Sequence, residues 1–248
     1  MIKQQLLIII LFTQLLFSAT PEQIERYISI SNSEEQLITL ESQFSQMQNN
    51  INQISKEEPG TYDMQLLSIR FREYLQKNVS ENEMDEIMKQ YKNVVLLQFT
   101  SVQNDAEYDE EEAKVYMQEL QTEENATVRM GLLDEISEKL YKKENIGILF
   151  DDLMKPLMQN SKNSAQIDDE TMKKSKEAYI KRMIASGKVE TAYSTREFSI
   201  EELEELLKIV KTPEIDHESK VVFSATAYAL REFFLSIANR YDVSKHKR

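Results

Sequence analysis

The chain has no cysteine and no tryptophan, and it has only four glycines, four prolines and two histidines. Without cysteine there can be no disulfide, no thiolate metal ligand and no lipid attached in the manner of bacterial lipoproteins. So few glycines and prolines argue against the tight turns of β-sandwiches and barrels, and they leave no glycine-rich loop to hold phosphate. The histidines, His217 and His246, lie in polar segments, where we expect solvated side chains rather than a metal site or a Ser-His-Asp triad.

Helix-forming residues dominate what remains. Glu, Gln, Lys, Leu, Met and Ile are abundant, and their side chains suit helices. Hydrophobic residues make up 41% of the chain, which is enough for a core that holds without disulfide bonds. We therefore predict an all-α fold, a helical bundle built from two related multi-helix halves behind a signal peptide.

Residues 1–19 have the pattern of a secretory signal peptide, in which Lys3 precedes the largely apolar run Leu6–Phe17. This run is shorter than the roughly 20 residues that a membrane-spanning helix needs, and polar residues interrupt it. We predict cleavage after Ala19 and export, with the periplasm as the expected location; an uncleaved N-terminal anchor is the alternative. No later apolar stretch is long enough to span a membrane.

The charge balance is acidic. Lys and Arg number 30 against 43 Asp and Glu, for a net charge of −13, and loss of the signal peptide removes Lys3 alone, which leaves −14. Such a field repels nucleic acid and anionic lipid, whose binding begins with phosphate neutralisation by Lys and Arg. We expect the short basic tail, residues 244–248, to be solvated.

An internal match is the most informative feature of the sequence. Ser80 with Glu83, and Ser199 with Glu202, have the S-x-x-E spacing of a capping box, in which each residue satisfies a backbone N–H of the other. The second box lies 119 positions after the first, and each is followed by an apolar stripe at helical spacing. The stripes are Met84, Ile87, Met88 and Tyr91, and Leu203, Leu206, Leu207 and Val210; Tyr74 and Tyr193 precede them at the same offset.

The match predicts two halves, residues 20–124 and 125–243, with the boundary near residues 121–127. We expect the first half to contain helices over 22–29, 33–55, 64–77 and 80–102, and another that starts in the acidic stretch 105–112. In the second half we expect helices over 128–143, 146–158 (bent by Pro156) and 168–185, one after Ser199, and a last one. The apolar seam of that last helix comprises Phe223, Ala227, Leu230, Phe234, Ile237 and Tyr241.

The segment Phe198–Pro213 resembles the signature of an exported bacterial family called domain of unknown function 2059, F-[ST]-x-x-E-L-x-x-L followed by Thr-Pro or Ser-Pro. The chain departs from the signature at Ile209–Val210, where aromatic residues are expected, and at Glu214–Ile215, where glycine usually follows the proline. The resemblance implies a helical periplasmic protein without catalytic residues, and a diverged second copy around Val79–Lys92. The matching residues are Phe198, Ser199, Glu202, Leu203, Leu206, Thr212 and Pro213.

Catalytic and metal-binding constellations are weak. The acidic stretch from Asp105 alternates like a calcium loop, but Glu110 and Tyr116 occupy the positions that need glycine and glutamate. A carboxylate pair that acts as acid and base is possible, yet the sequence cannot single out two residues among 43 acids. We therefore predict no catalytic, metal or cofactor site. The motif residues that we single out are structural: Ser80, Glu83, Ser199, Glu202, Thr212 and Pro213.

These observations favour a non-catalytic binding module of the cell envelope, a monomer or homodimer whose partner is a protein or an amphipathic small ligand and not nucleic acid. Two alternatives remain. One is an envelope hydrolase that uses a carboxylate pair, and the other is a structural or stress-response protein without a defined ligand.

Overall fold

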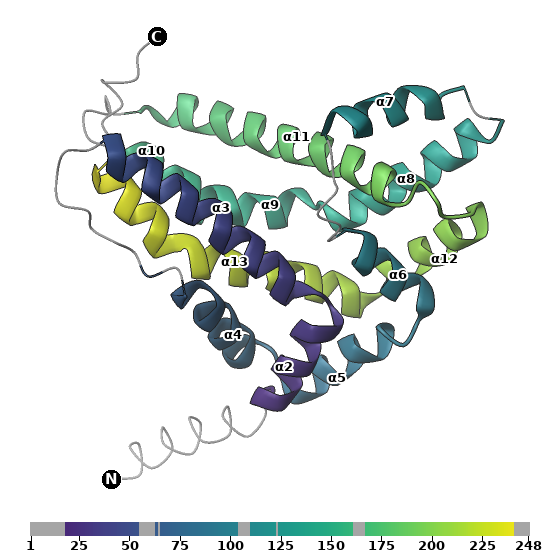
Figure 1. Ribbon diagram of the computed structural model, residues 1–248, viewed down its shortest axis with the longest axis horizontal. Helices are drawn as coiled ribbons and strands as arrows, with labels where there is room; N and C mark the ends of the chain where they lie inside the picture. The colour runs from purple at the N-terminus through teal and green to yellow at the C-terminus, as the bar shows by residue number, and fades with distance from the viewer. Residues whose placement is uncertain are drawn as a thin grey trace.

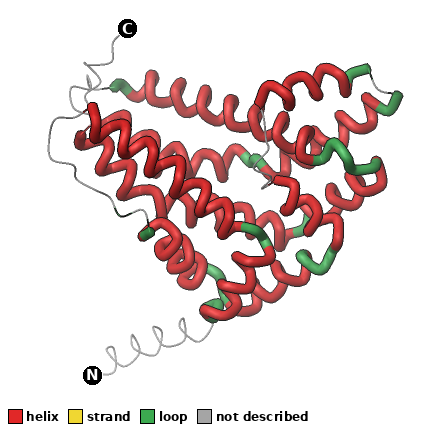
Figure 2. Tube along the Cα trace, in the orientation of Figure 1, coloured by secondary structure: helices red, strands yellow, loops and turns green. Residues whose placement is uncertain are grey.

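The computed structural model of the chain describes residues 18–54, 63, 65–103, 110–122, 124–160 and 167–240. Within these ranges the regular structure is helical, apart from one isolated antiparallel bridge between Ser18 and Ser80. Figure 2 shows helices and loops and no strand in the described ranges, and the predicted all-α class is confirmed. The predicted signal run up to Phe17, Tyr241 of the predicted last seam and the tail 244–248 lie outside the described residues.

The first described helices are α2 (Pro21–Ile30), α3 (Ser33–Ile54), α4 (Leu66–Asn78), α5 (Glu81–Gln90), α6 (Val94–Gln103) and α7 (Glu110–Leu120). They are followed by α8 (Ala126–Leu140), α9 (Lys143–Leu149), the π-helix η1 (Phe150–Met154), α10 (Lys155–Asn160), α11 (Asp169–Ser194), α12 (Ile200–Val210) and α13 (Pro213–Arg240). In the part of the chain that the structure describes, none of these helices is long and apolar enough to cross a membrane.

The C-terminal helix α13 organises the bundle. It packs against α4, α5, α9 and α10, and it crosses the middle of the view in Figure 1. Helix α3 lies alongside it, where Phe44 meets the rings of Phe233 and Phe234 at centroid distances of 5.0 and 5.6 Å. Helix α11 forms the upper edge of the view with α7, and α8, α12 and α6 lie together at the right, where α12 packs on α8 and α6.

The helices of the two predicted halves share one core. The turn between α7 and α8 falls at the predicted boundary, but α13 of the second half packs on α4 of the first, and α11 packs on α6 and α7. Buried side chains from both segments, such as Phe71 and Phe233, belong to the same apolar cluster. The halves therefore lie interleaved around a common interior.

One predicted helix is wrong in its extent, because residues 80–102 form two helices rather than one. The chain turns at Tyr91–Asn93, and Asn93 then begins α6: its Oδ1 accepts the N–H of Val95 at 2.8 Å. Asparagine is a favoured N-cap, so the break has a local cause. The turn lets α6 pack against α11 and α12 instead of continuing along α5.

Two further boundaries differ from the prediction. The helix predicted over 168–185 continues to Ser194 as α11, through Gly187. The segment predicted over 146–158 is divided by η1, in which the N–H of Lys155 bonds to the carbonyl of Phe150. Pro156 has no N–H for the i−4 hydrogen bond of an α-helix, and its ring crowds the preceding turn. The wider π-turn just before Pro156 relieves this conflict.

Candidate functional site

Both predicted capping boxes are formed. At the start of α5, the N–H of Glu83 donates to Ser80 Oγ at 3.3 Å and the N–H of Ser80 donates to Glu83 Oε2 at 2.8 Å. At the start of α12, Glu202 and Ser199 exchange the same two bonds at 3.2 and 2.7 Å. These four residues satisfy helix ends, and they play a structural role.

Thr212 and Pro213 begin α13. The N–H of Ile215 donates to Thr212 Oγ1 at 3.4 Å, and Pro213 occupies the first helical position, where its missing N–H costs nothing. Asn93, which lies 119 positions before Thr212, caps α6 in the corresponding place. None of the six predicted motif residues lines the cavity described below. These residues instead fix the starts of α5, α12 and α13, which lie around the cavity.

The two capped segments match in register. Helix α5 begins at Glu81 and α12 at Ile200; α6 begins at Val94 and α13 at Pro213, and each second start lies 119 positions after the first. The contacts are reciprocal as well, since α5 packs on α13 and α12 packs on α6. We call α5 with α6 the first capped pair, and α12 with the first turns of α13 the second capped pair.

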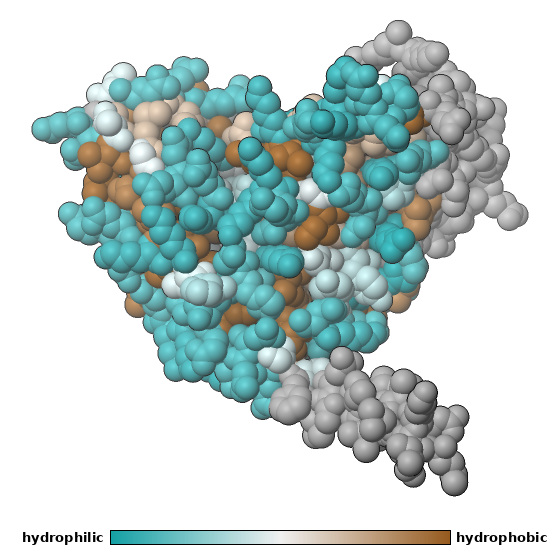
Figure 3. Space-filling view, turned by 180° about the vertical axis from the view of Figure 1, so that it is seen from behind, coloured by the Kyte–Doolittle hydropathy of each residue, from teal (hydrophilic) through white to brown (hydrophobic). Residues whose placement is uncertain are grey.

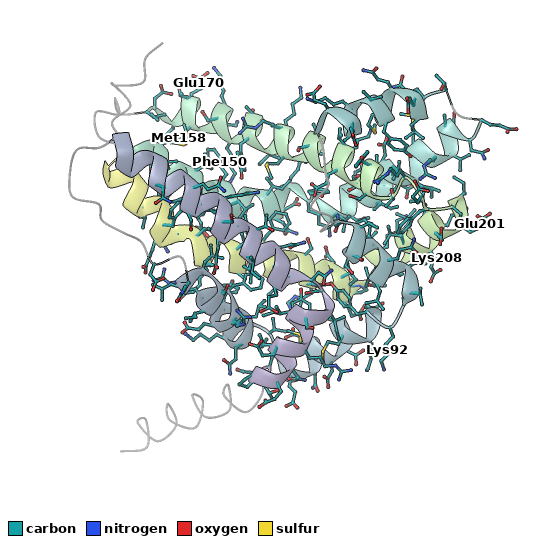
Figure 4. The ribbon with its side chains drawn as sticks, viewed as in Figure 1. Lys92, Phe150, Met158, Glu170, Glu201 and Lys208 are labelled. Atoms are coloured by element: carbon teal, nitrogen blue, oxygen red, sulfur yellow. The ribbon has the colours of Figure 1, made fainter. Side chains whose placement is uncertain are left out.

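The inner faces of the capped pairs are apolar and the outer faces are charged. Met84 and Ile87 are buried on α5, as are Leu203 and Leu206 on α12. Figure 4 shows Lys92, Glu201 and Lys208 projecting outward from the same region. The predicted apolar stripes therefore face the interior. They are formed by Met84, Ile87, Tyr91 and the half-buried Met88, and by Leu203, Leu206, Leu207 and Val210.

Between the capped pairs lies a cavity of about 310 Å³. Five lining residues come from the first pair: Tyr91, Leu96, Phe99, Thr100 and Gln103. Five come from the second pair, each 119 positions later: Val210, Ile215, Glu218, Ser219 and Val222. Phe223 and Thr226 farther along α13, together with side chains from α2, α3, α8, α9 and α11 and the residues next to them, complete the wall. The cavity thus lies where the two matching segments meet.

A buried glutamate is the main polar group in this cavity. Glu218, 8% exposed, accepts hydrogen bonds on Oε1 from the hydroxyls of Tyr27 and Tyr91, each at 2.6 Å. Burial disfavours the charged carboxylate and raises the pKa of Glu218 to about 7, although the two hydroxyls act in the opposite direction. This carboxyl can therefore exchange its proton near neutral pH.

The tyrosines are held firmly around Glu218. Their rings meet edge to face with centroids 6.2 Å apart, and burial together with the charge of Glu218 raises the pKa of both hydroxyls well above 10. They therefore remain donors at physiological pH. Ser31 and Ser33, whose hydroxyl oxygens lie 2.6 Å apart, extend this polar end of the cavity.

A second carboxyl lines the cavity from α11. Glu190 accepts the Tyr141 hydroxyl on Oε2 at 3.4 Å, and burial raises its pKa. The Tyr141 ring lies against Gly187, where an added Cβ would come within 2.5 Å of ring atoms. Gly187 is thus the residue that lets this ring sit beside α11.

Sequence reasoning missed the residues of this cavity, Glu218 above all. On α13 the buried positions Ile215, Glu218 and Ala225 follow helical spacing with the half-buried Val222, so Glu218 occupies a place in an apolar stripe. A charged residue on such a stripe was the available signal. Its neighbour His217 is only half exposed, with Nε2 at 3.7 Å from Glu83 Oε1, rather than freely solvated.

The described residues contain no group of three or more His, Asp or Glu side chains placed to hold a metal ion. The cavity instead offers two carboxyls whose pKa values are raised, Glu218 strongly and Glu190 as well, together with several hydroxyls and apolar side chains. Comparison of the chain with known protein families, with curated proteins and with solved structures finds no match.

Proposed function

We propose that this protein is a non-catalytic binding module, and that it holds a small amphipathic molecule in the cavity between the capped pairs. The observation that carries the proposal is the cavity itself, an apolar space of about 310 Å³ with one buried carboxyl held by two tyrosine hydroxyls. Ligand sites in proteins are concave, mostly apolar and fixed in orientation by a few convergent polar groups.

The face of the molecule shown in Figure 3 offers less support for a docked protein than the cavity offers for a small ligand. On the face shown in Figure 3, apolar side chains lie scattered among hydrophilic ones and do not merge into one large patch. Protein-binding surfaces usually present a larger contiguous apolar area. The proposal therefore places the ligand inside the bundle.

We also propose that the protein works after export, in the periplasm or cell envelope. The signal-peptide pattern of residues 1–19 supports export, and the resemblance of Phe198–Pro213 to the exported bacterial family agrees with it. Ala19, the last residue of the predicted signal peptide, is 1% exposed and its N–H donates to the Val79 carbonyl at 2.9 Å, so cleavage after Ala19 would remove this contact from the exported protein.

An envelope hydrolase is the competing function. It would use Glu190 and Glu218, the two carboxyls that line the cavity. Acid–base hydrolysis needs environments that push the two pKa values apart, whereas burial raises the pKa of both carboxyls here. Neither carboxyl therefore lies in surroundings that favour its ionised form, which the second member of an acid–base pair needs.

The test is titration of the exported form with three eight-carbon amphiphiles, octylamine, 1-octanol and octanoate, followed by calorimetry. We expect at least one of them to saturate a single site. Val222→Trp, which fills the cavity from α13, is expected to abolish that binding. Lys220→Trp on an exposed face of the same helix is the matched control and is expected to keep it.

Absence of saturable binding to the folded wild-type protein would overturn the proposal. Binding that Val222→Trp leaves intact, with the variant folded by circular dichroism, would place the ligand elsewhere and overturn it equally. Turnover of a glycan or peptide by protein purified free of contaminants, with loss of that activity in Glu190→Gln or Glu218→Gln, would favour the hydrolase.

A further inference from the structure

The charge of the cavity wall is one-sided. The lining residues include two carboxyls, Glu190 and Glu218, and no Lys, Arg or His. An anionic ligand would bring like charge beside these groups, and repulsion between like charges disfavours its binding. A cation would meet opposite charge without any basic side chain competing for it.

The hydrogen bonds of Glu218 leave one oxygen available. Both tyrosine hydroxyls donate to Oε1, and within the described part of the chain no hydrogen bond reaches Oε2. The hydroxyls can fix the carboxyl plane while Oε2 accepts a bond from a ligand N–H. A charge-assisted bond of this kind is stronger than a neutral one.

Aromatic rings surround the same end of the cavity. Tyr27, Tyr91 and Phe99 contribute to its wall, and their faces attract cations through the ring quadrupole. Aliphatic side chains contribute the other apolar part of the wall, and uncharged polar groups lie among them. The aliphatic residues are Leu96, Leu140, Leu149, Val210, Ile215 and Val222. The cavity therefore combines an acidic, aromatic end with a wall whose surface is more apolar than polar.

We propose that the ligand is an organic amine with an apolar body, and that its ammonium group binds Glu218 Oε2 between Tyr27 and Tyr91. The proposal rests on the function proposed above and names the chemical class of the ligand. Octylamine has about nine non-hydrogen atoms and suits a cavity with room for roughly ten waters at liquid density.

Binding of an amine should then depend on pH. An alkylammonium has an ordinary pKa of about 10.4, so it stays charged, whereas burial raises the pKa of Glu218 to about 7. Below pH 7 the amine must first displace the proton of Glu218. We expect its affinity to fall by about tenfold per pH unit below 7 and to level off above it.

Other ionisable groups near Glu218 do not account for the same dependence. On α13, Asp216 pairs with Lys142 and His217 faces Glu83 of α5, while Tyr27 from α2 and Tyr91 after α5 remain protonated. Glu190 of α11, beside Tyr141, lines the cavity and is the one additional carboxyl. Glu190→Gln therefore belongs in the test: pH dependence that persists in this variant assigns the titration to Glu218, whereas its loss would assign it to Glu190 and overturn the proposal.

The experiment compares octylamine, 1-octanol and octanoate at pH 8 by calorimetry. We expect octylamine to bind about 10 to 100 times more tightly than 1-octanol, as for one charge-assisted bond, and octanoate to bind more weakly than both. Glu218→Gln should bring the affinity for octylamine down to that for 1-octanol. The affinity of this variant for 1-octanol should stay within about threefold of the wild-type value.

A second variant keeps the carboxyl in place. Tyr91→Phe removes one of the two hydroxyl donors that lower the pKa of Glu218, so the pH at which amine binding levels off should move upward. This shift tests the role of Glu218 even where Glu218→Gln is poorly folded, and a purely structural role of Tyr91 would not produce it.

The outcomes separate the two proposals. Binding of 1-octanol or octanoate at least as tight as that of octylamine, blocked by Val222→Trp, would overturn the amine proposal and keep the cavity as a binding site. Amine binding that is unchanged by Glu218→Gln and flat between pH 5 and 8 would do the same. No binding of any of the three amphiphiles would overturn both.

Discussion

Glu218 is the residue on which the proposed ligand site depends. It is one of few charged side chains in the core, and its two hydroxyl donors come from α2 and from the turn after α5. Burying a carboxyl is costly unless it is hydrogen-bonded or protonated, and this site provides for both. A neutral residue in place of Glu218 would avoid the cost of burying a carboxyl. Because stability alone does not explain the glutamate, we propose a functional role for it.

The first prediction concerns stability against pH. Because the folded protein binds the Glu218 proton more tightly than the unfolded chain, the stabilisation is complete below pH 4.5 and is lost as pH rises through about 7. We expect the free energy of unfolding of the wild type, relative to Glu218→Gln, to fall by roughly 3 kcal/mol across that window. Urea unfolding at a series of pH values measures it, and parallel profiles of the two proteins would contradict it.

The second prediction uses two glycines in helices. Gly187→Ala should lower the free energy of unfolding by about 1–3 kcal/mol, because its Cβ would overlap the Tyr141 ring. Gly131→Ala meets no atom within 4 Å and should raise stability by about 0.5–1 kcal/mol, as alanine does in an open helix. Thermal or urea unfolding compares them, and equal effects of the two changes would count against the close approach at Gly187.

At the scale of elements, the order of helices follows from caps and apolar periodicity. The capping boxes at Ser80 and Ser199 fix where α5 and α12 begin, so those starts could be read from the sequence. The division of α5 from α6 could not, because apolar residues continue across Tyr91–Asn93 and only the capping Asn93 marks the break. The end of α11 at Ser194 could not be predicted either, because a glycine usually indicates a helix end. Gly187 instead lies inside the helix and makes room for the Tyr141 ring.

The third prediction tests the two capping boxes. Ser80→Ala and Ser199→Ala should each lower the free energy of unfolding by about 0.5–2 kcal/mol, because each leaves backbone N–H groups without an acceptor. Ser80→Asn and Ser199→Asn should retain most of the stability, since asparagine caps helices well. Chemical denaturation of the four variants measures these changes. Equal losses of unfolding free energy for alanine and asparagine would show that the cap hydrogen bond is not the cause.

The fourth prediction concerns the buried stripes. Ile87→Ala and Leu206→Ala should each cost about 2–5 kcal/mol, because both side chains are almost fully buried and truncation opens a void. Glu204→Ala on the exposed face of α12 is the control, and its effect should stay within about 0.5 kcal/mol. A loss at Ile87 or Leu206 no larger than that of the control would mean that the stripe does not carry the packing.

At the scale of the molecule, two matched helical segments enclose a shared space. Five residues of the first capped pair and five of the second line the cavity at a constant offset of 119, and α5 and α12 pack reciprocally on α13 and α6. Descent of both segments from one duplicated unit stays a prediction, and this register agrees with it. The cavity itself was beyond sequence reasoning, because Tyr27 and Glu218 lie 191 positions apart and only the fold joins them.

The most direct test of the central claim, that this cavity is the ligand site, is a crystal structure of the protein with 8-bromooctylamine. The account predicts one anomalous bromine peak among the apolar side chains of the cavity, such as Leu149 and Val222, with the amine at the Glu218 end. A bromine peak confined to the outer surface, with the cavity occupied by water alone at saturating amine, would contradict it.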